Sequence, residues 1–154
     1  MEINLNKLRD IAVSAAAERA VLEGAQIANT ARKAEMEKQQ IKREAKALIE
    51  SIPTHLEKAA MCPISTESGR LVQALIPIVK EQLTSCMATK GYLSDREKKF
   101  LSTVKNMLKS LSIQGAEVFI HRETVEGSYS NYDGDQAEGP CKHYYICAQV
   151  NLDS

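Results

Sequence analysis

Two cysteines and two histidines are the residues of this chain whose types and spacing could do chemistry. Cys141, His143 and Cys147 fall within seven positions, and His121 lies 20 residues before the first of them. Thiolate and imidazole groups bind Zn²⁺, and a Cys/His pair is the core of many nucleophilic enzymes. However, there is no C-x₂-C pair, and no orienting acid or oxyanion-binding signature accompanies the residues. We therefore expect no metal site, no cofactor and no catalysis; an enzyme that uses His121, His143 and Cys147 is the third of three hypotheses.

The elements that would position these residues are two β-strands. Residues 116–123 and 142–152 both alternate between apolar and polar side chains, which is typical of half-buried strands. If the strands are antiparallel neighbours, one face is aliphatic and the other is polar and aromatic, the composition of a binding surface. We expect this second face to contact a partner, and its residues are Phe119, His121, His143, Tyr145 and Cys147.

The 18 residues between these strands, 124–141, predict a long acidic loop. Its segment DGDQAE, residues 133–138, has the acidic character of a calcium loop but lacks the spaced oxygen ligands of one. We expect a solvated loop.

The N-terminal part of the chain is rich in good helix formers. Residues 4–52 hold no proline and a single glycine, Gly24. One continuous helix of this length would reach about 70 Å, far beyond the radius of gyration of about 13 Å for a compact domain of about 100 residues. Such a helix would extend past its own domain and would need a partner. Two helices folded back at Gly24 are the alternative.

A stripe of small residues marks the first half of this helix and predicts helix pairing. Small side chains at a spacing of four let two backbones approach closely. The residues expected to mediate coiled-coil-like oligomerisation, as a dimer or a larger homo-oligomer, are Ala16, Ala20, Gly24 and Ala28, with Leu22 and Ile27 beside them. A solvated helix that crosses its own domain is the alternative interpretation.

Three further helices are expected in the middle of the chain. Pro53 ends the first helix, and Thr54 with Glu57 forms a capping box that starts a short one. Residues 65–89 carry apolar side chains at helical spacing and predict a central core helix that Pro77 kinks. A second capping box, Ser94 with Glu97, opens a helix over residues 94–112.

Together these elements predict an α+β, mainly helical fold. Its order is a long N-terminal helix, a short helix, two core helices and a C-terminal antiparallel strand pair. We expect two domains: a helical arm for oligomerisation, residues 1–52, and a small α+β domain, residues 53–154.

Charge separates along the chain although the total of 20 basic and 20 acidic residues is balanced. Residues 51–115 carry nine Lys and Arg against five Asp and Glu, whereas residues 116–154 carry two against seven. The balanced total argues against a dedicated nucleic-acid binder.

A nucleic-acid-binding module is nevertheless the second hypothesis. Three helices followed by a strand pair match the order of a winged helix, although the acidic strand pair would repel phosphates. The side chains that could contact an anion or nucleic acid are Lys98, Lys105 and Lys109 on one helix face, and Arg70 in the polar turn ISTESGR.

The chain has no signal-like segment and no run of about 20 apolar residues, so we expect a cytoplasmic protein that does not enter a membrane. Its four cysteines would then be reduced.

The segments HLEKAA, VKNMLKSLSIQGAEVFI and YYICAQV, with the charged N-terminal helix before them, resemble the general plan of small phage-encoded accessory proteins. The resemblance covers most of the chain as a pattern and transfers no functional residue. It implies a small binding protein of the host cytoplasm that blocks or sequesters a host component, as an inhibitor does. The first hypothesis is thus a non-enzymatic, oligomeric interaction protein that binds a protein or a small anionic ligand.

Overall fold

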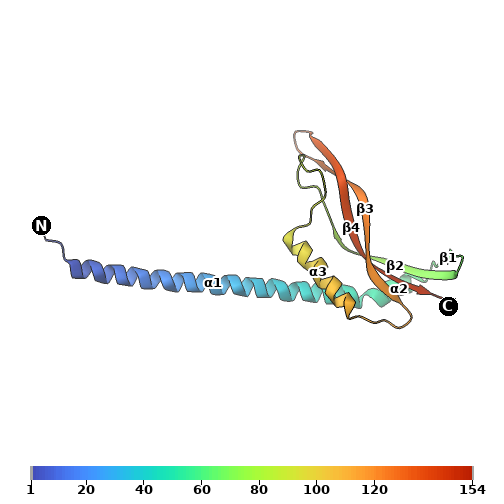
Figure 1. Cartoon of the computed structure of the whole chain (residues 1–154), viewed down its shortest axis with the longest axis horizontal. Helices are drawn as coiled ribbons and strands as arrows, with labels where there is room; N and C mark the ends of the chain where they lie inside the picture. The colour runs from blue at the N-terminus through green and yellow to red at the C-terminus, as the bar shows by residue number, and fades with distance from the viewer. Residues whose placement is uncertain (1, 154) are drawn as a thin grey trace. The chain divides into compact units, whose positions relative to one another are not determined.

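The computed structural model describes residues 2–153, which form three helices and four strands (Figure 1). In chain order these are α1 (Leu5–Glu50), α2 (Ile52–Ala59), β1 (Ile64–Thr66), β2 (Gly69–Lys80), α3 (Asp95–Lys109), β3 (Glu117–Ser130) and β4 (Gln136–Asn151). The chain divides into two compact units, Met1–Gln40 and Ile41–Ser154. The fold is α+β, as the sequence predicts, but with more strand and fewer helices than expected.

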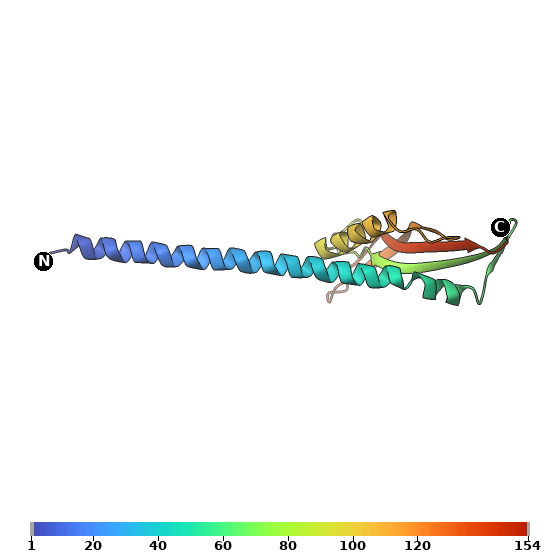
Figure 2. The same ribbon diagram turned by 90° about the horizontal axis from the view of Figure 1, so that it is seen from below.

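Helix α1 runs without a break from Leu5 to Glu50, through Gly24 (Figure 2). A hairpin at Gly24 is therefore not present.

The four strands form one antiparallel sheet in the order β1-β2-β4-β3 (Figure 1). In the β3–β4 hairpin, Phe119 pairs with Cys147 and His121 with Tyr145. The expected antiparallel neighbours are confirmed, but the long loop over 124–141 is wrong. Thr124 to Ser130 and Gln136 to Cys141 continue the two strands, because each backbone satisfies the N–H and C=O groups of the other.

The central core helix expected over residues 65–89 is also wrong, since this region forms β1, a tight turn and β2. Val72, Ala74 and Ile76 alternate inward and are buried, while Leu75 points to the other face. Apolar residues on both faces produce a run that fits a helix as well as a strand. Pro77 lies at a register shift in β2, where a missing N–H is tolerated in a strand.

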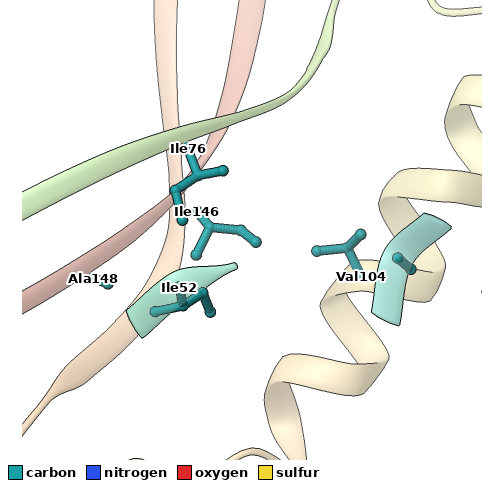
Figure 3. Packing of buried hydrophobic residues seen from close by; sticks show 6 residues of the cluster. Ile52, Ile76, Val104, Ile146 and Ala148 are labelled. Carbon is teal, nitrogen blue, oxygen red and sulfur yellow. The ribbon is translucent and has the colours of Figure 1, made fainter. Parts of the chain in front are cut away.

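The core lies between one face of the sheet and three helical segments (Figure 3). Ile76 and Ile146, a cross-strand pair, meet Ile52 of α2 and Val104 of α3. Ala45, from the last turns of α1, and Ala148 of β4 complete this cluster, and both are fully buried. These turns belong to the arm in the sequence-based division of the chain, yet they supply part of the core of residues 41–154.

The two expected capping boxes have different outcomes. Ser94 accepts a hydrogen bond from the Glu97 backbone N–H, and the Glu97 side chain accepts one from Ser94 N–H, so this box is confirmed. Thr54 caps nothing, because α2 already begins at Ile52 with Pro53 in its first turn. A proline there has no N–H, so the first turn has one unpaired donor fewer.

The segment just after β4 is tied to the start of β2. The Arg70 backbone N–H donates to Asp153 Oδ2 at 2.6 Å, and the Arg70 guanidinium lies 3.3 Å from Oδ1. Gly69, at φ of 119°, lies so close that a Cβ there would come within 2.8 Å of the Asp153 side chain. Arg70 is therefore engaged in an ion pair at this edge and does not join the lysines of α3.

Candidate functional site

The most prominent candidate surface is the exposed stretch of α1 over residues 5–40. Eight large apolar side chains of this stretch are between 52% and 71% exposed: Leu5, Leu8, Ile11, Val13, Val21, Leu22, Ile27 and Met36. Single exposed hydrophobic residues are ordinary, but eight large ones on one helix indicate an interaction surface. The predicted oligomerisation residues all lie in this stretch.

Helical geometry places six of these eight side chains in two seams, while Leu5 and Val21 fall in neither. When apolar residues follow one another by steps of four and three in turn, their direction around the helix axis changes by only about 20° every seven residues. When every step is four residues, the direction changes by about 40° at each step. The first seam consists of Val13, Ala17, Ala20, Gly24, Ile27, Ala31 and Ala34. The stripe expected from the sequence crosses this seam at Ala20 and Gly24, while Ala16 and Ala28 flank it.

The second seam lies on the opposite side of α1 and contains Leu22. Its residues are Leu8, Ile11, Ala15, Leu22, Ala25 and Met36. The sequence-based set of oligomerisation residues thus combines members of both sides of the helix.

The first seam has the shape of a helix-packing surface. A shallow hollow of about 660 Å³ lies beside Ile27, Ala31 and Ala34, with Glu23, Gln26 and Thr30 around it. Large side chains at Val13 and Ile27 alternate with Ala and Gly, so knobs and holes are both present along one line.

The sheet face opposite the core carries the predicted partner-binding residues. This open face is defined by Leu75, Phe119, His121, Tyr145 and Cys147, with His143 at its end. The rings of His121 and Tyr145 lie 6.2 Å apart, and the Tyr145 hydroxyl shares a 3.5 Å hydrogen bond with His143 Nδ1. The structure therefore brings the predicted residues onto one face.

Cys147 lies on the open face but is not accessible there. Its register neighbours are Leu75 and Phe119, and only 1% of the residue is exposed. Gln73 Nε2 donates to its Sγ at 3.4 Å. Burial, as the main cause, raises the pKa of the Cys147 thiol, so the thiol stays protonated at neutral pH and is a poor nucleophile.

Cys141 is separated from the histidines by its packing. Its thiol lies against the backbone at Gly91 and Gly127, with 1% of the residue exposed. Burial raises the pKa of this thiol too, and the carboxylates of Glu81 and Glu126 add to the effect. No group of three or more His, Cys, Asp or Glu side chains within residues 2–153 is arranged to hold a metal ion.

The acidic turn at residues 131–135 is held by the side chain of Asn131. The Asn131 side-chain oxygen accepts backbone N–H groups from Asp133 and Asp135, at 3.1 and 2.9 Å. This arrangement is an Asx turn, which accounts for the residue types of the loop.

Lysines gather in a second candidate site beside α3. A shallow hollow of about 440 Å³ is lined by Lys98 and Lys105 of α3, by Lys90 and Tyr92 of the preceding loop, and by Tyr144 of β4. We call this the lysine hollow. The spacing of residues on α3 identifies Lys98 and Lys105, but also suggests Lys109, which does not line the hollow. Lys90 was missed because nothing in its local sequence points toward α3.

No protein-family model, curated protein or solved structure matches this chain. The resemblance to phage accessory proteins therefore stays a prediction. None of the helices within residues 2–153 is both long and apolar enough to cross a membrane.

Proposed function

We propose that this chain is a non-enzymatic, intracellular interaction protein that associates with further copies of itself through the first seam of α1. The observation that carries the proposal is the exposure of the seam: Val13 and Ile27 are 70% and 71% exposed. A helix of this kind gains most of its stability from packing an apolar side, and residues 5–40 of α1 have that side available.

Two features favour another copy of this chain as the occupant. Residues 1–40 carry six basic and six acidic side chains, so two copies meet without net repulsion. In addition, the seven-residue spacing of the first seam continues as Ile41, Ala45 and Leu48, and this continuation packs in the core of residues 41–154. The same seven-residue spacing thus occurs both in the buried last turns of α1 and in its exposed part.

The arm is a better candidate than the open face for this association. On the open face, Leu75 and Phe119 are 48% and 38% exposed, and Cys147 is covered by its neighbours. The apolar side chains of the arm are more exposed, so a partner that covers them buries more apolar surface and gains more free energy.

Light scattering on the full chain and on Ile27→Glu tests the proposal. The wild type should form an oligomer whose mass falls with dilution, and Ile27→Glu should be a monomer at the same concentration. Gln39→Glu adds the same charge at an exposed position outside the seams and should leave the mass unchanged. Glutamate is a good helix former, so far-UV circular dichroism should confirm that the variants keep their helices.

Leu22→Glu decides whether the second seam takes part in the association. If this variant keeps the oligomer, the first seam alone mediates the association, and the measured mass gives the number of helices. If Leu22→Glu also dissociates it, both seams are covered and the assembly is a bundle of more than two helices. A monomeric wild type across the accessible concentration range, or an Ile27→Glu variant with unchanged mass, would contradict the proposal.

A further inference from the structure

The lysine hollow unites three positive charges from two segments of the chain. Lys98 and Lys105 lie two turns apart on α3, while Lys90 comes from the loop after β2. That loop is fixed by paired hydrogen bonds between the backbones of Gln82 and Tyr92, at 3.1 and 2.9 Å. The Gly91 N–H also donates to the Pro140 carbonyl at 2.7 Å. The convergence of the three lysines is therefore a property of the packed structure.

The ammonium groups of α3 lie against aromatic rings. Lys98 Nζ is 5.0 Å from the centre of the Tyr92 ring, and Lys105 Nζ is 5.9 Å from that of Tyr144. A cation over a ring is attracted by the negative face of the ring, which restricts the long side chain without neutralising its charge. Within residues 2–153, no carboxylate lies within ion-pair distance of Lys90, Lys98 or Lys105.

One acidic residue lines the same hollow, and it is already engaged. Glu81 Oε1 accepts the Lys142 backbone N–H at 2.7 Å. The lining therefore carries three positive charges against one negative charge. An anion in the hollow would relieve the mutual repulsion of the lysines and gain charge-assisted hydrogen bonds.

Apart from Ser102, the remaining side chains that line the hollow are apolar or aromatic. Leu93 and Leu101 each expose only 6% of their surface, and Tyr92 is half exposed. A volume of about 440 Å³ falls within the usual range for small-molecule sites, about 300–1,000 Å³. The site has room for an anionic group together with a ring or another apolar body.

We propose that the lysine hollow binds a phosphate group carried on an aromatic base, as in a nucleotide. Lysine is a point-charge ligand for phosphate, and three lysines match its multiple charges better than they match a single carboxylate. The phosphate lies among Lys90, Lys98 and Lys105, and the base lies toward Tyr92 and Leu93. The source is either a free nucleotide or one unit of a single-stranded nucleic acid. This inference does not depend on the association of α1.

Isothermal titration with adenosine monophosphate, and fluorescence anisotropy with a labelled single-stranded thymidine 12-mer, test the proposal on the full chain at low salt. We expect one nucleotide per chain, with Lys98→Gln and Lys105→Gln each weakening the affinity about tenfold, the scale of one charged hydrogen bond. Lys58→Gln, at an exposed position on α2, is the matched control and should bind like the wild type.

Lys109→Gln distinguishes the two sources. Lys109 follows Lys105 by one helical turn and lies outside the hollow, so only a ligand that extends along α3 reaches it. If Lys109→Gln weakens the 12-mer and leaves the mononucleotide unchanged, the hollow holds one phosphate of a strand. If the 12-mer binds no better than the mononucleotide, the ligand is a free nucleotide.

Two results would overturn the proposal: no binding of either probe at millimolar concentration, or affinities that Lys98→Gln and Lys105→Gln leave unchanged. The melting temperature of each variant shows whether it is folded. Light scattering of the same variants keeps this test separate from the proposed function, because a change in the hollow should leave the oligomeric mass as it is.

Discussion

The two compact units of this chain use the same kind of helix in opposite ways. Within α1, Ile41 and Ala45 are 3% and 0% exposed, whereas Ile27 and Met36 are 71% and 63% exposed. All four belong to one uninterrupted helix of similar composition. The difference is that residues 41–154 contain a sheet that packs against the last turns of α1, whereas residues 5–40 are helix alone.

This comparison shows where the stability of the chain resides. Burial of apolar surface contributes about 25 cal/mol per Å², so residues 41–154 gain most of the hydrophobic stabilisation. Residues 5–40 depend on helix propensity until a partner covers them. Mutations should therefore affect folding in the second unit and association in the first.

The largest difference in stability between the two units is expected from Ile146→Ala. Ile146 is fully buried at the centre of the core, and its truncation should lower the free energy of unfolding by about 2–5 kcal/mol. Urea denaturation monitored by circular dichroism measures this loss. Ile27→Ala is the matched change in the arm, and its effect on the monomer should stay below about 0.5 kcal/mol. If Ile146→Ala and Ile27→Ala lowered the free energy of unfolding of the monomer equally, the two units would not differ as described.

A smaller effect is expected at the start of α3. Ser94→Ala removes the side-chain acceptor of the capping box and should lower the free energy of unfolding by about 1 kcal/mol. Ser102→Ala, within the same helix, should be neutral or slightly stabilising, because alanine is the better helix former. A neutral Ser94→Ala would mean that water replaces the cap without loss.

The two buried cysteines should make the stability of the protein depend on pH. Because burial raises the pKa of Cys141 and Cys147 above the ordinary value of 9.0, the folded state holds these protons longer than the unfolded state does. Their contribution to stability is complete below the unfolded pKa and is lost as pH rises through the folded pKa. The urea concentration at the midpoint of unfolding should thus decrease as the solution is made alkaline.

Thiol labelling of the native protein checks the same point at single residues. The exposed Cys62 should react rapidly, whereas Cys141 and Cys147 should react only after unfolding. Substitution of Cys141 and Cys147 by alanine should remove the alkaline loss of stability but leave the rapid phase in place. Fast native labelling of Cys147 would mean that the open face is not packed as described.

The smallest effect is expected at the surface pair of Asp153 and Arg70. The Arg70 backbone N–H, and then its side chain, hold the pKa of the Asp153 carboxyl below its ordinary value. Its contribution to stability is present above the unfolded pKa and is lost as pH falls through the folded pKa. Asp153→Asn should therefore reduce the acid dependence of unfolding and change little at pH 7.

Local sequence alone determined several elements. Alanine, glutamate and lysine without proline predict α1, and Ser94 with Glu97 predicts the start of α3, because propensity and capping act within a few residues. Alternation over residues 116–123 and 142–152 also predicts the face shared by Phe119, His121, Tyr145 and Cys147, since side chains in a strand alternate between faces.

Tertiary structure decided the rest. Residues 71–79 carry apolar side chains that suit a helix or a strand, and only pairing of β2 with β4 selects the strand. Residues 124–141 are polar, and each half is extended because the other half hydrogen-bonds to it. Lys90 joins Lys98 and Lys105 because a folded loop carries it there. These contacts join residues far apart in the chain, and their energies do not appear in any local pattern.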